Sequence, residues 1–361
     1  MNILILGGTG AMGIHLVHLL YKSEHSIYVT SRSEHQSIEN IHYIHGNARN
    51  IEFLKPLLKK HWDVIIDFMV YSTNSFQERV AELLIATKQY IFLSSARVYA
   101  DSEEPITENS PRLLDISEDA EFLSTNEYSL SKARQEDMLK NSGMNNWTII
   151  RPYITYSENR FQLGVLEKEE WLYRALHGRT IVFSEDIITK ITTLTYGYDV
   201  SKSIISLLGN TKAYGETFHI TTHESITWHE VLNIYRDVIE KHTSIKPKVV
   251  FQNMSSFLQW RPSLYQIKYD RLFNRIFSNT KIAHYNNFDF TSVEQGLTNS
   301  LETFLANPDF KNINWKAEAI KDRYTKEYTP LKEINGFKQK MLYLVIRNMY
   351  FIYTLIKKRR L

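Results

Sequence analysis

The chain has 361 residues, 43% of them hydrophobic and 23% charged, which is ordinary for a globular protein with a sizeable core. Its formal net charge of +3 is too small to indicate a nucleic-acid partner, and we expect none. The absence of cysteine excludes disulfides, a thiolate nucleophile and cysteine-ligated zinc, and the histidines lack metal-ligand spacing, so no metal site is predicted.

The first predicted element is a short apolar strand, Asn2–Leu6, which is followed at once by a glycine-rich turn and an apolar-periodic helix. Gly8, Gly10 and Gly13 have the G-x-G-x-x-G spacing that allows a tight turn, close approach of a pyrophosphate and close helix packing. The helix start offers unpaired N–H groups and a positive dipole end to phosphates. The sequence therefore predicts a dinucleotide site formed by Gly7, Gly8, Thr9, Gly10, Ala11, Met12 and Gly13.

Strands and helices alternate from there to about residue 150. The predicted strands are 26–30, 41–44, 64–66, 90–93 and 147–150, and the predicted helices are 51–60 with Asn50 as N-cap, 75–87 and 128–141. Repeated β-α units with continuously apolar strands predict a doubly wound parallel sheet, the α/β Rossmann class. Residues 99–126 are predicted to form an acidic loop at the carboxyl edge of the sheet, either a ligand-entry segment or a solvated insertion.

Beyond residue 151 the units become irregular and predict a smaller mixed lobe. Its predicted helices are 167–177, 200–208, 228–241 and 292–305, and its strands are 190–194 and 216–220. We therefore divide the chain into a dinucleotide-binding domain (1–152), a substrate-binding lobe (153–305) and a helical tail (306–361).

The tail is predicted to be amphipathic and basic at its end. One helical stripe holds Leu342, Val345, Met349, Ile352 and Ile356, and Lys357–Arg360 follow it. Three alternatives remain: an interfacial helix on anionic lipid, a seam between the copies of a homodimer, or a helix packed on its own domain. We find no signal-peptide pattern and no apolar run of eighteen residues, and we expect a cytoplasmic location.

A tyrosine and a lysine four residues apart, Tyr128 and Lys132, lie on one helix face. A nearby ammonium favours the anionic form of a phenol, which brings its pKa towards the range of acid–base catalysis. Ser95, at the end of the fifth strand, delivers a hydroxyl to the same edge of the predicted sheet. An exposed helical pair is the alternative, but the glycine turn and the serine favour a catalytic site formed by these three residues.

Taken together, these segments resemble the extended short-chain dehydrogenase/reductases, also called the NAD-dependent epimerase/dehydratase family. The resemblance rests on the glycine turn, Ser94–Tyr99, Tyr128–Lys132 and Arg151-Pro152, and it continues through Tyr198–Val200 and Asp270 to the helix 292–305. It implies that Tyr128 is the general acid/base on a sugar oxygen, that Ser95 binds the same oxygen, and that Lys132 holds the nicotinamide ribose. It also implies that the substrate is a nucleotide-activated sugar.

The cofactor preference follows from a departure from this family pattern. NAD-preferring members carry an acidic residue at the end of the second strand, where this chain has Ser31 and Arg32. A cation suits a 2′-phosphate, so NADP is favoured; if Arg32 instead stacks on adenine, NAD remains open. The predicted cofactor set is completed by Asn47, which replaces a common aspartate, and by Ala48, Asp67 and Phe68.

Other departures bear on the reaction. Ala96 and Arg97 stand where the sugar dehydratases carry acidic residues, which argues against dehydration, and Ile154 replaces an asparagine that reaches the substrate phosphates in many epimerases. Two reactions remain: reduction of a keto sugar by NADPH, which we expect, and epimerisation with retained NAD. A non-catalytic NADP-binding protein is the third alternative, although it would not need all three catalytic residues. Family analogy further suggests a place in polysaccharide biosynthesis.

Overall fold

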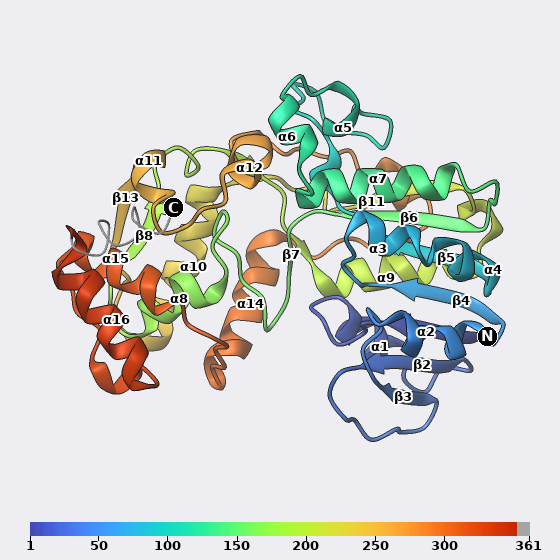
Figure 1. Ribbon diagram of the computed structural model, residues 1–361, viewed down its shortest axis with the longest axis horizontal. Coiled ribbons are helices and arrows are strands. Elements are labelled where there is room, and N and C mark those ends of the chain that lie inside the picture. The colour runs from blue at the N-terminus through green and yellow to red at the C-terminus, as the bar shows by residue number, and fades with distance from the viewer. Residues whose placement is uncertain (352–361) are drawn as a thin grey trace. The chain divides into compact units, whose positions relative to one another are not determined.

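The computed structural model describes residues 1–351, which form two compact units that are interleaved in the sequence (Figure 1). The sheet unit comprises Met1–Glu158, Ile191–Ser225 and Phe273–Leu297. The helical unit comprises Asn159–Lys190, Ile226–Leu272 and the chain from Thr298 onward. The sequence-based division by role, by contrast, uses contiguous segments, and that assignment of roles stays a prediction.

The sheet unit is built on a parallel sheet of seven strands in the order β11-β6-β5-β4-β1-β2-β3. The strands are β1 (Asn2–Leu6), β2 (Ser26–Ser31), β3 (Ile41–His45), β4 (Trp62–Asp67), β5 (Thr87–Leu93), β6 (Trp147–Pro152) and β11 (Glu216–Ile220). The order reverses beside β1, because β2 and β3 lie on one side of it and β4 and the later strands on the other. The predicted doubly wound parallel sheet is thereby confirmed.

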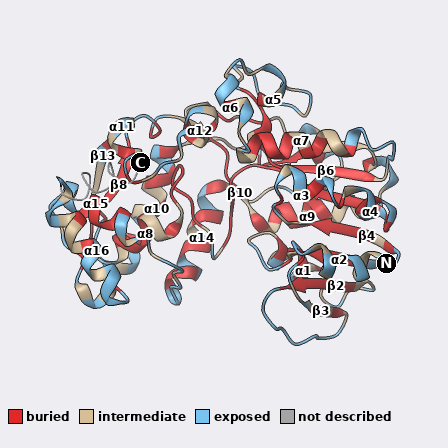
Figure 2. Ribbon diagram, viewed as in Figure 1, coloured by how far each residue is buried: buried red, intermediate tan, exposed pale blue. Residues whose placement is uncertain are grey.

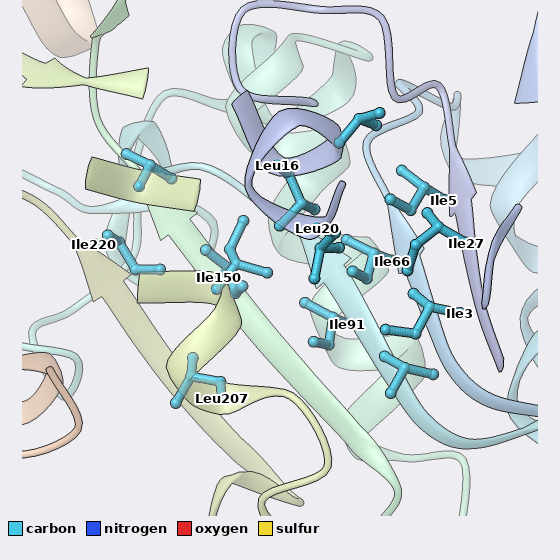
Figure 3. Close-up of a cluster of buried hydrophobic side chains, with 14 of the residues drawn as sticks. Ile3, Ile5, Leu16, Leu20, Ile27, Ile66, Ile91, Ile150, Leu207 and Ile220 are labelled. Carbon is cyan, nitrogen blue, oxygen red and sulfur yellow. The ribbon is translucent and has the colours of Figure 1, made fainter. Parts of the chain in front are cut away.

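Both faces of the sheet are buried, which explains why its strands are apolar without alternation (Figure 2). Ile3 and Ile5 point to the face covered by α1 (Gly13–Leu20) and α9 (Gly197–Leu207), within the cluster drawn in Figure 3. Leu4 and Leu6 point to the opposite face, where they join buried residues of α2 (Ile51–Leu58), α3 (Thr73–Gln77), α4 (Val80–Ile85) and α7 (Tyr128–Lys140). Successive residues of one strand therefore serve two separate cores.

The single helix predicted over 75–87 is wrong: the chain forms α3 and α4 instead, and Thr87 already belongs to β5. The break lies at Arg79, whose buried guanidinium donates to the Ser75 carbonyl oxygen through Nε at 2.5 Å and to the Arg49 carbonyl oxygen at 3.2 Å. The Arg79 amide bonds to Phe76 and not to Ser75. The side chain therefore takes the acceptor that a continuous α-helix needs for its backbone.

The acidic interval 99–126 contains two short helices, α5 (Leu113–Ile116) and α6 (Ala120–Ser124), where the sequence predicted only a loop. Short elements complete the sheet unit: the 3-10 turns η1 (Ala96–Val98) and η2 (Thr211–Ala213), the strands β7 (Thr155–Tyr156), β9 (Ile191–Thr192) and β10 (Thr195–Tyr196), and α13 (Thr280–Ala283). The strands β7 and β10 pair in parallel. The helix α14 (Val293–Ala306) contributes residues to both units.

The helical unit surrounds one small parallel pair, β8 (Ile181–Ser184) with β13 (Val249–Gln252). Its other elements are α8 (Lys168–Leu176), β12 (Ile226–Thr227), α10 (Trp228–Thr243), α11 (Met254–Phe257), α12 (Leu264–Gln266), the π-helix η3 (Ile267–Arg271), α15 (Trp315–Thr325), η4 (Leu331–Glu333) and α16 (Phe337–Asn348). The fully buried Arg174 of α8 donates to Glu318 and Asp322 of α15, both at 2.7 Å. This buried ion cluster fastens α15 to α8.

The tail helix, predicted over 338–361, is observed as α16 over Phe337–Asn348. It ends before Met349, which the prediction placed on the same helix and whose backbone is not helical (φ −128°, ψ 43°). Two positions of the predicted stripe, Ile352 and Ile356, lie outside the described residues. Within residues 1–351, none of the helices has both the length and the apolar character required to cross a bilayer.

Candidate cofactor and catalytic site

The glycine turn between β1 and α1 is sterically closed on one side and open on the other. A Cβ atom on Gly13 would lie 2.6 Å from the Gly8 carbonyl carbon, so the start of α1 touches the turn backbone itself. Gly7 has φ +74°, and a Cβ there would meet the Met69 sulfur at 2.7 Å. A Cβ on Gly10 would meet no atom within 4 Å. The turn therefore packs tightly beneath and leaves open space at Gly10, as close approach of a pyrophosphate requires.

The start of α1 is left without side-chain capping. Its N-cap, Met12, makes no capping hydrogen bond, and the first turn has no acidic residue. The N-terminal end of α9 packs against the glycine turn. Ser201 Oγ donates to the Met12 carbonyl oxygen at 2.8 Å, and a Cβ on Gly197 would lie 2.6 Å from the Ala11 carbonyl oxygen. Uncapped N–H groups in a fixed turn suit an anion, so these residues fit a dinucleotide pyrophosphate.

The end of β2 carries the residues that were predicted to choose between NAD and NADP. Ser31 is buried, its carbonyl oxygen accepts from the Gly46 amide at 2.8 Å, and Arg32 is exposed. Asn47 is also exposed, and its side-chain oxygen accepts from the Arg49 amide at 3.1 Å. The neighbouring Ala48 is buried. An exposed guanidinium and an exposed amide group thus stand on adjoining strand ends.

Asp67, at the end of β4, is fully buried and directs its carboxylate inward. It accepts from the Tyr90 hydroxyl and from the Met69 amide, both at 2.8 Å. Burial raises the pKa of Asp67. Phe68 continues the strand direction by donating its amide to the Leu6 carbonyl oxygen at 3.0 Å and packs against the core beneath α1 and α9. In this arrangement Asp67 fixes the backbone at Met69, next to Gly7.

Lys132 is 1% exposed and projects from α7 to the ends of two strands. Its Nζ donates to the Leu93 carbonyl oxygen at 2.6 Å and to the Met69 carbonyl oxygen at 3.5 Å. Nζ also lies 4.5 Å from the ring centre of Phe92 and 6.0 Å from that of Tyr128. Burial lowers the pKa of Lys132 to about 8. The ammonium is therefore charged at neutral pH and retains a third N–H beyond these two carbonyl bonds.

Tyr128 and Ser95 are both tied to Arg97. Tyr128 is the first residue of α7, whose N-cap is Glu127, and its ring centre lies 5.2 Å from the Arg97 guanidinium. Arg97 pairs with Glu127 at 2.5 Å. The buried Ser95 lies two residues after the end of β5, as the N-cap of η1, and accepts the Arg97 amide on its Oγ at 3.2 Å. Arg97, which departs from the dehydratase pattern, thus contacts both Ser95 after β5 and the first residues of α7.

A buried ion pair behind these residues was not predicted from the sequence. Glu136 of α7 accepts from Arg151 Nε at 2.8 Å and Nη2 at 2.5 Å, and from Ser94 Oγ at 2.5 Å. Arg112 lies 3.3 Å away. Burial by itself raises the pKa of Glu136, but the bonds and charge of Arg151 outweigh it and leave that pKa lowered. The one visible signal was the spacing of Glu136 four residues after Lys132, on the same helix face.

The histidine nearest the glycine turn is paired with a carboxylate. His15 on α1 lies 3.2 Å from Glu158, which also accepts from the Tyr196 hydroxyl. Burial by itself raises the pKa of Glu158, but these two partners outweigh it and lower that pKa to about 2. Among residues 1–351, no three or more His, Asp and Glu side chains are grouped so that they could hold a metal ion.

The sequence was compared with protein-family models and with curated proteins. Residues 3–220 match the NAD dependent epimerase/dehydratase family. The chain is 28% identical over 244 residues to the chloroplast stem-loop binding protein of 41 kDa b from Arabidopsis thaliana, a match over 63% of this chain and 60% of that protein. The chain thus spans about three fifths of the length of this curated relative.

Solved structures share the fold at low sequence identity. An epimerase from Methanothermobacter thermautotrophicus superposes with a TM-score of 0.66 at 17% identity, over 85% of this chain and 92% of that one. The dTDP-glucose 4,6-dehydratase of Bacillus anthracis, solved in complex with NAD, gives 0.64 at 19% identity, over 85% and 97%.

Proposed function

Because the chain belongs to the NAD-dependent epimerase/dehydratase family, we propose that it reduces a keto group of a nucleotide-activated sugar by hydride transfer from NADPH. The observation that carries this proposal is the position of Lys132. Its buried ammonium lies between the ends of β4 and β5, within 6.0 Å of the Tyr128 ring centre, and the open glycine turn follows the neighbouring strand β1.

In this proposal each residue has a separate task. Tyr128 gives its phenolic proton to the sugar oxygen, and Ser95 donates a hydrogen bond to the same oxygen. The charged Lys132 favours the phenolate that remains and donates its third N–H to the nicotinamide ribose. The bound nicotinamide supplies the hydride. The glycine turn holds the pyrophosphate through its backbone N–H groups.

The preference for NADP rests on Arg32. The side chain is exposed at the end of β2, where a carboxylate would hydrogen-bond a ribose and where a cation pairs with a 2′-phosphate. The Bacillus anthracis neighbour was solved with NAD, so NAD remains the alternative for this chain.

A nucleotide-activated sugar is proposed as the substrate on two grounds. The family pattern implies it, and the Bacillus anthracis neighbour is named for dTDP-glucose. The same neighbour is named a dehydratase, but Ala96 and Arg97 leave this chain without an acid after Ser95, so we do not propose elimination of water. Ile154 stands where many epimerases carry an asparagine that reaches the substrate phosphates, so the usual diphosphate pose is not part of this proposal.

Two alternatives to the reductase have support of their own. The first is epimerisation with retained NAD, which the name of the Methanothermobacter thermautotrophicus neighbour supports. The second is a non-catalytic NADP-binding protein; the curated relative is named for binding a stem-loop, which is not in itself a redox reaction. Removal of the Tyr128 hydroxyl strongly lowers turnover in either enzyme and changes nothing in a non-catalytic protein.

The test is titration calorimetry of NADPH and NADH with the wild type, Arg32→Ala and, as control, Lys88→Ala. Lys88 is an exposed cation at the amino end of β5, on the opposite edge of the sheet. We expect NADPH to bind at least tenfold more tightly than NADH, Arg32→Ala to remove this difference, and Lys88→Ala to keep it. Equal binding of both cofactors, or co-purified NAD, would favour the epimerase. Binding of neither would overturn the cofactor site.

A further inference from the structure

The outer face of α16 carries large exposed apolar side chains, together with the exposed Lys338 and Asn348, and is not covered by the described part of the chain. Among its residues only Tyr343 and Ile346 are buried. The exposed fractions of the outward apolar side chains are 79% for Phe337, 45% for Met341 and 41% for Leu342, with 50% for Met349 just beyond the helix. Two positions of the stripe predicted from the sequence, Leu342 and Met349, are thus about half exposed.

The orientation of α16 is fixed from its inner side. The Tyr343 hydroxyl donates to Asp322 and accepts from the Thr329 amide, both at 2.7 Å, and all three groups are buried. Arg347 Nε donates to the Glu327 carbonyl oxygen at 2.8 Å. Turning the apolar face inward would break these buried bonds, so the helix presents this face to its surroundings.

Exposed apolar side chains are concentrated in this part of the chain. Of the seventeen large exposed hydrophobic residues among residues 1–351, seven lie within 28 residues, and these are Tyr324, Tyr328, Phe337, Met341, Leu342, Met349 and Phe351. Single exposed hydrophobic residues need no explanation, but a gathered set indicates an interaction surface.

Positive charge is concentrated in the same segment. Residues 335–361 contain seven Lys or Arg and no Asp or Glu, so the other 334 residues have a formal net charge of −4 although the whole chain has +3. In the sequence, residues 352–356, which are apolar apart from Thr354, are followed directly by Lys357–Arg360. An apolar face with flanking cations is the chemistry of an interfacial membrane helix.

We propose that the exposed outer face of α16 binds the surface of an anionic lipid bilayer, with the helix lying in the interface. Nucleic acid would use the cations but would gain nothing from the exposed Phe337, Met341 and Leu342. A second copy of the chain would cover the apolar face but would bring two +7 segments together. An anionic bilayer accommodates both features.

The test is flotation of the full chain with vesicles of phosphatidylcholine alone and with a third of phosphatidylglycerol added. The variant Met341→Asp/Leu342→Asp removes the apolar face. The control Ile245→Asp places the same kind of charge on another exposed aliphatic residue of the helical unit. Circular dichroism checks that all three proteins are folded.

We expect the wild type and Ile245→Asp to float with the anionic vesicles at least tenfold more than with neutral ones, and the double variant to lose at least nine tenths of this binding. Equal flotation of wild type and double variant would overturn the proposal. The proposal would also be overturned if the wild type did not bind anionic vesicles. In that case, concentration-dependent dimers, or RNA binding that the double variant lacks, would show what the face binds instead. Cofactor binding is unaffected in every case, so this test is independent of the proposed reaction.

Discussion

The Nζ atom of Lys132 lies 2.6 Å from the carbonyl oxygen of Leu93, so a side chain of α7 is bonded to the last residue of β5. Ser94 and Ser95 follow Leu93 directly. The helix that carries Tyr128 is therefore held to the strand that delivers Ser95 by the lysine assigned to the ribose. Lys132 is thus both the proposed ribose-binding residue and the residue that positions α7 against β5.

Lys132→Met is expected to abolish turnover and to change the pH dependence of stability. Burial lowers the pKa of Lys132 from 10.5 to about 8. Between these values the unfolded chain binds more protons, so the contribution of Lys132 to the free energy of unfolding rises with pH, by about 3 kcal/mol at most. The stability of wild type relative to Lys132→Met should therefore increase from pH 8 to 10.5. Urea unfolding at several pH values measures this, and a constant difference would contradict it. The exposed Lys88→Met is the control.

Glu136→Gln is expected to lower the free energy of unfolding at pH 7 by about 3–5 kcal/mol, because it leaves the buried Arg151 without its counter-charge. Since the pKa of Glu136 is lowered, the carboxylate contributes fully above its unfolded pKa of 4.5, and the contribution is lost as pH falls through the lower folded value. The gap between wild type and variant should therefore narrow below pH 4.5. Asp137→Asn, at the half-exposed neighbour, should cost under about 1 kcal/mol.

Gly10→Ala and Gly13→Ala separate cofactor binding from folding. The Cβ added at position 13 would meet the Gly8 backbone, which should cost about 1–3 kcal/mol of stability, whereas the one added at position 10 meets open space and should change stability by less than about 0.5 kcal/mol. Both variants should bind the dinucleotide at least tenfold more weakly. Thermal unfolding and calorimetry give the two readouts. Unchanged affinity in the stable Gly10→Ala variant would argue against a pyrophosphate at this turn.

Tyr128→Phe is expected to lower kcat by about 10²–10⁴-fold, the usual contribution of a general acid, and to leave the cofactor Kd within about twofold. Tyr324→Phe, at an exposed tyrosine of the helical unit, should leave both values unchanged. The measurement is single-turnover oxidation of NADPH with the keto-sugar nucleotides found active on the wild type. If the wild type turns over no such compound, the epimerase is tested by the exchange of deuterium between the cofactor and the sugar. The Tyr128→Phe variant should lose this exchange.

The strands and the glycine turn could be predicted because their signals are local. β1 is apolar throughout since both sheet faces are covered, and the turn follows it without a gap. The helix 75–87 could not be predicted correctly, because the carbonyl groups that Arg79 binds include one thirty residues upstream in the sequence.

The candidate site was predictable only in part for a related reason. The i, i+4 spacing places Tyr128 and Lys132 on one face, but the partners of Glu136 are Ser94, 42 residues away, and Arg151, 15 residues away. No spacing rule connects these three residues before the sheet brings β5 and β6 together.

The ion cluster of Arg174 has a consequence for synthesis of the chain on the ribosome. Its carboxylate partners Glu318 and Asp322 are made 144 and 148 residues later. Until those residues emerge, Arg174 of α8 lacks the carboxylates that allow its charge to be buried, so the helical unit cannot complete its core. Chains truncated before residue 315 should therefore yield a sheet unit attached to a segment that chaperones and proteases recognise as unfolded.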